Sequence, residues 1–398
     1  MKYAAVALAL IGCGAAIPAV PSKGGPAWRE LTSDHFTLWT DGSRDAAVEL
    51  VQRMEDLRQA VVGVGFRGAG AQGRVLVIAL RDSDEVGAYM PNDFAIAVAS
   101  PSNSYIHQPL ILLNVDTGGD FEIAAHELTH TISQVVIPKQ PRWFAEGLAS
   151  YFETIEIHRS EGKIDLGRAP MYRGEPVIQH HLISLASLFA CTELACADAG
   201  FYATAWALFT YLTNQRGAEL ARYEQGLIAS PGNHAQAWAD AFGNVPLETL
   251  EQEMRAWLSH GSHQVLHFNV TLKTWPVAER ALGDADVYTA RGLLRYQFQG
   301  REDAAKVEID AALALDKTHP LARFLEYRLA KDKIDPEIAK ATAEAHPDDW
   351  RAWLLVADTA QSSDDAVAAT RKSCELIAKN PAIAIEWQAC ATLAQPAQ

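Results

Sequence analysis

Five consecutive residues, His126-Glu127-Leu128-Thr129-His130, combine the residue types and the spacing of a metal-dependent hydrolase. On a helix, side chains four positions apart lie about 40° apart around the axis, so both imidazoles share one face. Two neutral imidazoles on one face can bind a tetrahedral zinc ion, and a neighbouring carboxylate can reach a water on that metal. The pattern therefore predicts a zinc site in which Glu127 acts on water.

A candidate third ligand, Glu146, lies in the segment Pro141–Tyr151. The segment starts with a proline, which suits the first turn of a helix. The link Pro138–Gln140 is short, so this helix and the one bearing the histidines should be antiparallel neighbours. On the face opposite its apolar residues the second helix carries Glu146 and Glu153, and we expect Glu146 to approach the imidazole pair. The alternative is a carboxylate that simply faces solvent.

The first of these helices is predicted from about Phe121 to Gln134, with Asp120 as its N-cap. His126 and His130 lie nearly opposite the centre of its apolar stripe, which argues against histidines packed in a core. The remaining alternative is a pair of surface histidines. The stripe consists of Phe121, Ala124, Ala125, Leu128, Ile132 and Val135.

These residues resemble a known family. His126–His130 followed by Arg142-Trp143-Phe144-Ala145-Glu146-Gly147-Leu148-Ala149 is similar to the gluzincin metallopeptidases, and more narrowly to the bacterial peptidase-MA-like family with tetratricopeptide repeats. Trp28–Leu38 and Tyr202–Leu208 also resemble that family. The resemblance covers roughly residues 28–258 and implies zinc bound by His126, His130 and Glu146, with a peptide or protein as substrate.

Two departures from the family patterns matter. The aspartate found four residues after the third ligand in the thermolysin-like branch is Ser150 here, so its supporting role is unassigned. The Gly-x-Met-x-Asn motif of the large aminopeptidases is missing, so aminopeptidase activity of that type is not supported.

The resemblance also implies a hydrogen-bond donor for the oxyanion, a tyrosine or histidine from a helix beyond the third ligand. Tyr202, at the start of an apolar helix Tyr202–Leu212, is the preferred candidate, and His180 and His181 are the others. A phenol is a neutral donor at pH 7. The alternative is that Tyr202 is only a packed aromatic residue.

Together these features predict hydrolysis of a peptide bond, with Glu127 as general base and later as proton donor to the leaving amine. The alternative from another class is a lipid-anchored interaction protein whose protease fold binds zinc without hydrolysing peptides. The intact Glu127 argues against that alternative.

The N-terminus is predicted to direct export. An apolar run, Tyr3–Gly12, follows Lys2 and is too short to span a bilayer, which is typical of a signal peptide. Leu10-Ile11-Gly12-Cys13 resembles a bacterial lipobox, so Cys13 is a candidate lipid anchor; ordinary cleavage within residues 15–19 is the alternative. Either outcome predicts a protein of the bacterial cell envelope, in the periplasm or at the outer membrane, with residues 1–26 as signal and tether.

Four further cysteines fit an oxidising compartment. They form two sequence-local pairs, Cys191 with Cys196 and Cys374 with Cys390. Each pair is either a disulfide or two small buried residues. Neither has the Cys-x-x-Cys spacing of a thiolate zinc site.

Length and charge restrict the remaining classes. A chain of 398 residues suggests two or three domains, and its 49% hydrophobic and 21% charged residues are ordinary for a globular protein. The formal net charge of −15 argues against nucleic acid or an anionic membrane surface as principal partner. Beyond the N-terminus no stretch reaches the ~20 apolar residues that span a bilayer.

The order of predicted elements indicates an α+β fold. Strands are predicted at His35–Trp39, Arg74–Leu80, Phe94–Ala99 and Leu110–Val115, with a helix from Asp45 to about Val62 and a loop at residues 63–73. From Asp120 to about Ser259 the pattern is almost entirely helical. We therefore predict a gluzincin-like domain, a small mixed sheet plus active-site helices, over residues 27–270. By the resemblance, either of the last two strands would be the edge strand that pairs with substrate.

Residues 284–398 are predicted to form an all-α, tetratricopeptide-like solenoid. Small residues such as Ala290, Gly292 and Ala304 are placed as in such a repeat, and the junctions at Pro320, Pro347 and Pro381 are 27 and then 34 residues apart. About three helix pairs would then stack. They would present a groove to a protein partner, or else serve as a helical cap on the protease.

Overall fold

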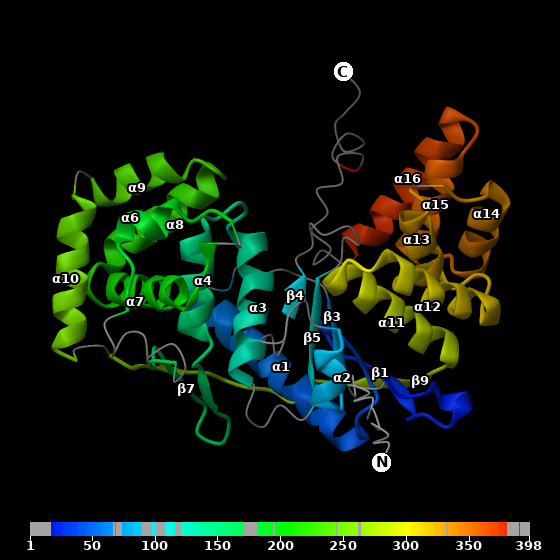
Figure 1. Ribbon diagram of the computed structural model, residues 1–398, viewed down its shortest axis with the longest axis horizontal. Coiled ribbons are helices and arrows are strands. Elements are labelled where there is room, and N and C mark those ends of the chain that lie inside the picture. Colours follow the sequence, from blue (N-terminus) through cyan, green and yellow to red (C-terminus); the bar gives the residue numbers. More distant parts are fainter. Residues whose placement is uncertain are drawn as a thin grey trace, which may run out of the picture.

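The computed structural model describes most of the chain as two groups of helices on either side of a central sheet (Figure 1). It describes residues 17–66, 68, 74–89, 98–100 (backbone only), 109–115, 121–170, 181–193, 196–243, 245–261, 264–331, 333–379 and 390. Asp120, Cys13 and His180, which the sequence analysis singled out, lie outside these residues.

The central sheet is mixed and has six strands in the order β4-β5-β3-β2-β1-β9. Neighbours β2 and β3 are parallel, as are β3 and β5, and the other pairs are antiparallel. The strands are β1 (Trp28–Thr32), β2 (Phe36–Thr40), β3 (Val75–Leu80), β4 (Val98–Ser100), β5 (Leu110–Asn114) and β9 (Ala278–Leu282). The predicted α+β class is thus confirmed.

Alternate residues of the strands enter two different hydrophobic cores, because side chains of a strand point to opposite faces. Val77 and Ile111 lie in the core beneath α1 (Arg44–Gly65) and α3 (Phe121–Val136). Their neighbours Ile78 and Leu112 lie in a second core that continues into the C-terminal helices. The sheet is therefore covered on both faces, which explains the unbroken apolar run of β3.

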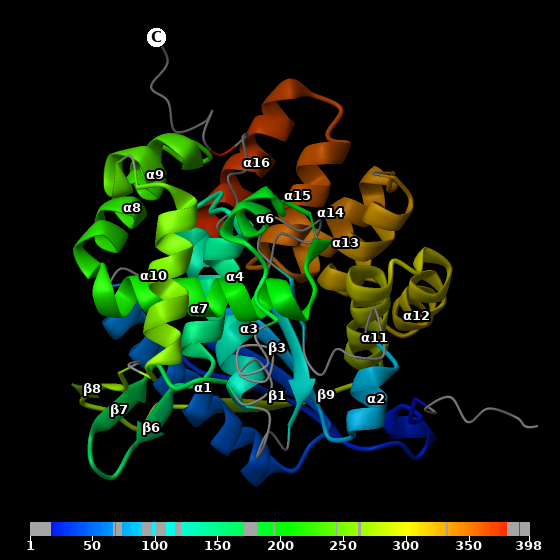
Figure 2. The same cartoon turned by 60° about the vertical axis from the view of Figure 1, so that its left-hand side comes forward.

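On the first face α3 is followed by a layer of helices far from the C-terminal helices. α4 (Arg142–Phe152) packs against α3, and α7 (Ala199–Gln215) packs against α4, with the others around them (Figures 1 and 2). The outer helices are α6 (Leu185–Ala190), α8 (Gly217–Ala229), α9 (His234–Phe242) and α10 (Leu247–Ser259).

On the second face, α2 (Ser83–Gly87) and the C-terminal helices cover the sheet. Val287, Leu293 and Leu294 of α11 share one buried core with Ile78 and Leu112. The C-terminal helices are α11 (Asp284–Gln299), α12 (Glu302–Leu315), α13 (Pro320–Leu329), α14 (Pro336–Ala345), α15 (Trp350–Thr359) and α16 (Ser363–Ala378). Residues 271–283, between the two predicted domains, include β9, which ties the start of α11 to β1.

Several details differ from the sequence-based predictions. The region after Asp120 is not wholly helical, because β6 (Glu156–His158) and β7 (Lys163–Leu166) form a hairpin that β8 (Leu266–Asn269) extends. The predicted strand Leu110–Val115 is not an edge strand, since β5 pairs on both sides. The predicted loop at residues 63–73 is partly helical, because α1 continues to Gly65.

Both predicted cysteine pairs form disulfides. The Cα atoms of Cys191 and Cys196 are 5.7 Å apart, and those of Cys374 and Cys390 are 5.6 Å apart. Among the described residues, no helix is both long enough and apolar enough to cross a lipid bilayer.

Candidate metal centre

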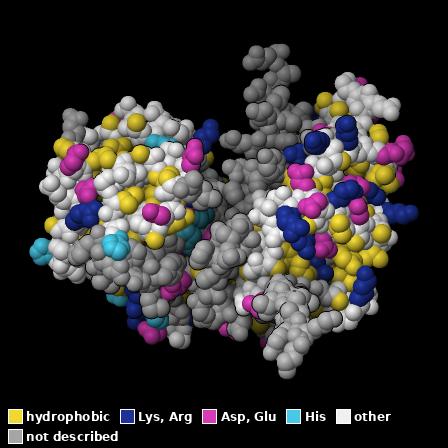
Figure 3. Space-filling model, in the orientation of Figure 1, with side chains coloured by type: hydrophobic (Ala, Val, Ile, Leu, Met, Phe, Trp, Pro, Cys, Tyr) yellow, Lys and Arg dark blue, Asp and Glu magenta, His cyan; other side chains and the backbone are white. Residues whose placement is uncertain are grey.

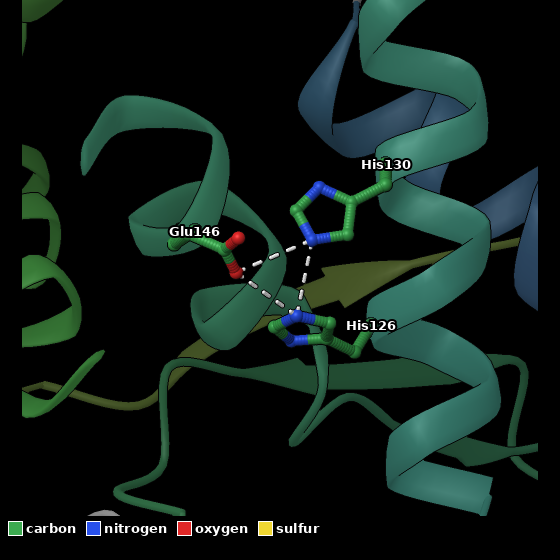
Figure 4. A group of neighbouring side chains, drawn as sticks. All are labelled: His126, His130 and Glu146. Atoms are coloured by element: carbon green, nitrogen blue, oxygen red, sulfur yellow. Dashed lines mark hydrogen bonds and ion pairs between the residues drawn. The ribbon is translucent and has the colours of Figure 1, made fainter. Parts of the chain in front are cut away.

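Two helices joined by a short turn bring the predicted ligands together. His126 and His130 project from α3 and Glu146 projects from α4, and Figure 4 shows all three side chains converging between the helices. The amide of Gln140 donates a hydrogen bond of 2.9 Å to the hydroxyl of Ser133, which ties the turn to α3. Pro141 precedes α4 as its N-cap rather than opening its first turn.

The three ligand atoms stand at nearly equal distances. The Nε2 atoms of His126 and His130 are 3.1 Å apart, and Glu146 Oε2 lies 3.4 Å from the first and 3.3 Å from the second. Ligands about 2.0–2.1 Å from a tetrahedral zinc are separated by about 3.3 Å, the edge of that tetrahedron. Two imidazole nitrogens and one carboxylate oxygen at these distances fit three corners of a zinc site and leave a fourth corner for water.

A second carboxylate, Glu153, orients the first histidine. Its Oε2 accepts a hydrogen bond of 2.8 Å from Nδ1 of His126, and its side chain has no exposed surface. This bond directs Nε2 toward Glu146 and His130, an arrangement typical of metal-binding histidines. Ser150, at the position where the thermolysin-like branch of the gluzincins has an aspartate, has a buried hydroxyl with no hydrogen-bond partner.

The sequence analysis placed Glu153 on the same face as Glu146 but gave it no role. The spacing of seven positions was the available signal, since residues two helical turns apart lie on the same face. What the sequence did not reveal was the way α4 crosses α3, which decides that Glu153 meets His126.

The electrostatics of the centre favour a cation. Burial disfavours the charged form of His126, yet its hydrogen bonds with Glu146 and Glu153 outweigh that effect and raise its pKa to about 9. Burial likewise opposes ionisation of Glu146, but the neighbouring His130 and His126 lower its pKa well below the usual value. The carboxylates thus place negative charge around both imidazole rings. His126 is buried, so it is not the surface histidine of the alternative interpretation.

Glu127 is next to His126 in α3 and is partly buried. Its charge is among those that raise the pKa of His126, so the carboxylate is close to that ring. The predicted base therefore lies beside the candidate metal centre.

Of the oxyanion candidates, Tyr202 lies in the first turn of α7 and is partly buried. Its ring contacts Phe201, and the guanidinium of Arg142 lies 5.9 Å from the centre of the Phe201 ring. Arg142 also approaches Oε1 of Glu146 to 3.6 Å, so the turn that carries Tyr202 is near the ligand helix. His181 is exposed just before α6.

A second group of possible ligands lies on the hairpin. Glu156, His158 and Asp165 are near one another and more exposed than the first group. A guanidinium nitrogen of Arg168 already lies 3.1 Å from the carboxylate of Glu156 and 3.3 Å from that of Asp165. Because the guanidinium of Arg168 already pairs with both carboxylates, the α3–α4 group is the better candidate for a metal centre.

Comparisons with known proteins find no family model, no curated protein and no solved structure that match this chain. The functional argument therefore rests on the geometry of the centre.

Proposed function

We propose that this protein is a zinc-dependent peptidase. The observation that carries the proposal is the triangle of His126 Nε2, His130 Nε2 and Glu146 Oε2, with edges of 3.1–3.4 Å, beside Glu127. Such a donor set suits zinc, and a carboxylate next to the first histidine suits peptide hydrolysis.

Each residue of the site would have a separate role in the reaction. His126, His130 and Glu146 hold the ion, which when bound supplies a Lewis acid and lowers the pKa of water toward ~7. Glu127 removes a proton from the attacking water and later delivers it to the leaving nitrogen. Tyr202 donates a hydrogen bond to the oxyanion as negative charge develops, with His181 as the alternative donor.

The wider assignments are also proposals. The residues that resemble peptidase-MA-like gluzincins support membership of that family, and the N-terminal pattern supports export to a bacterial envelope with lipid attachment at Cys13. The edge position of β4 in the described part of the sheet supports a role in pairing with extended substrate.

The test measures zinc content and peptide cleavage in the same preparations. The full chain should bind about one zinc ion and cleave an unbiased peptide library. Glu127→Gln should keep the zinc and lose about 10²- to 10⁴-fold in rate, the usual contribution of a general base. Glu146→Ala should lose both.

Each contrary result has a definite meaning. Full zinc occupancy in Glu146→Ala would overturn the third-ligand assignment. Zinc without cleavage in the wild-type chain would favour the non-hydrolytic interaction protein, with the repeats as its binding part.

A further inference from the structure

An aromatic pocket lies beside the start of α4. Its volume is about 620 Å³, within the range of small-molecule sites. Trp143, Phe189, Tyr223 and Trp238 line it, contributed by α4, α6, α8 and α9. In Figure 1 these outer helices form the green group on the far side of α4 from the sheet.

The four aromatic rings pack against one another, and two of them remain partly exposed to the pocket. Trp143 stacks on Phe189 and on Tyr223, with ring centres 5.1 and 5.8 Å apart, and Trp238 meets Phe189 edge-on at 4.9 Å. Trp143 and Tyr223 are buried, whereas Phe189 and Trp238 are partly exposed. A fixed aromatic wall of this kind favours another flat apolar group.

Arg142 connects this pocket to the metal centre. Its side chain lines the pocket, and one of its guanidinium nitrogens lies 3.6 Å from Oε1 of Glu146. The same guanidinium lies over the ring of Phe201, next to Tyr202. One arginine therefore contacts the pocket, a metal ligand and the turn that carries the proposed oxyanion donor.

We propose that this pocket binds an aromatic side chain of the peptide substrate and so sets its cleavage preference. The proposal rests on the proposed peptidase function, because Arg142 contacts both the pocket and the proposed metal ligand Glu146. The aromatic ring of the substrate packs against Phe189 and Trp238, the two rings of the pocket that are partly exposed.

The first experiment measures binding without any reaction. Saturation-transfer NMR on the full chain compares N-acetyl-phenylalaninamide with N-acetyl-alaninamide, and only the aromatic amide should bind. Ala239→Phe places a ring in the cavity from an exposed lining position of α9 and should weaken binding at least tenfold. Gln236→Phe adds the same ring to an exposed position of α9 outside the pocket and should leave binding unchanged.

The second experiment reads the cleavage preference. Cleaved library peptides should be enriched in aromatic residues at one position, and Ala239→Phe should abolish that enrichment while zinc content stays the same. Selective binding of the aromatic amide without any cleavage would support the pocket as an aromatic-binding site and would contradict the peptidase proposal. Cleavage that Ala239→Phe leaves unchanged, with no selective binding, would overturn the pocket and retain the peptidase.

Discussion

At the scale of single residues, the candidate metal centre depends on a carboxylate that would not contact the metal. Glu153 is fully buried and fixes the ring of His126 through Nδ1. A histidine held in this way presents Nε2 in one tautomer and one orientation, so less ordering remains to be done when a metal binds.

We predict that Glu153→Gln weakens zinc binding by about 10- to 100-fold, the usual effect of losing such a partner. Competition with a chromophoric chelator measures the affinity. Ser150→Ala is the matched control, because its hydroxyl is buried in the same helix without a hydrogen-bond partner. A similar loss in both variants would mean that α4 packing, not Glu153, holds His126.

A second residue-scale prediction concerns pH. Glu85 is buried in α2 and is 3% exposed, and burial together with the charge of Asp41 raises its pKa to about 7. In the unfolded chain its pKa is near 4.5. The folded state thus binds the proton more tightly, so stability is lost as pH rises from about 4.5 to 7.

Glu85→Gln should remove this loss. Urea unfolding at pH 5 should differ little between the variant and the wild type, whereas at pH 8 the variant should be more stable by up to about 3 kcal/mol. Equal free energies of unfolding at pH 8 would show that the carboxylate is not held in the buried state described here. Asp84→Asn, at an exposed position of the same helix, is the control.

At the scale of elements, the approach of α4 to α7 sets the position of Glu146. Gly147 is the contact point, since a Cβ there would lie 2.6 Å from the carbonyl oxygen of Ala205 and 3.0 Å from Cβ of Phe209. The two helices can pack this closely only because residue 147 has no side chain.

Gly147→Ala should therefore force α4 away from α7. We expect a loss of about 1–3 kcal/mol in stability, as for overpacked cores, and weaker zinc binding because the adjacent Glu146 moves. Thermal unfolding and zinc content measure the two effects. Gly217→Ala, in α8 with nothing near its Cβ, should be neutral or stabilising, and an equally stable Gly147→Ala would contradict the packing argument.

The elements also show what a sequence can and cannot reveal. The α3–α4 pair was predictable because its helices, its turn and its ligand spacing are all local patterns. The β6–β7 hairpin was missed although Ile157, Ile164 and Leu166 alternate around a turn at Gly162, because the flanking helices dominated the interpretation. Strand β9 was missed because its pairing with β1 joins residues about 250 positions apart, which no local pattern records. Strand β1 was missed although it also pairs locally with β2.

At the scale of the whole molecule, the C-terminal helices cover the sheet as well as following it. The sequence left open a partner groove or a helical cap, and the shared core of Ile78, Leu112, Leu293 and Leu294 favours the cap. Figure 3 shows Lys and Arg side chains mixed with Asp and Glu over these helices, so charges of both signs share this face.

We predict that a chain ending at Gly283, which retains β9, loses stability because one face of the sheet becomes exposed to water. It should bind the dye ANS and unfold at a lower temperature than the full chain, and Trp39 and Leu112 should be among the newly exposed residues. An unchanged melting temperature without dye binding would show that residues 17–283 fold independently.

The ladder between β1 and β9 also has a consequence for the order of folding. Loop closure over so long a span is costly in entropy, so contacts of this kind tend to form late. Until residues 278–282 have been synthesised, the outer side of β1 offers its unpaired amides and carbonyls to any other extended chain. The nascent protein is thus most prone to aggregation during the interval before β9 emerges, and α11 can begin to cover the sheet only after that.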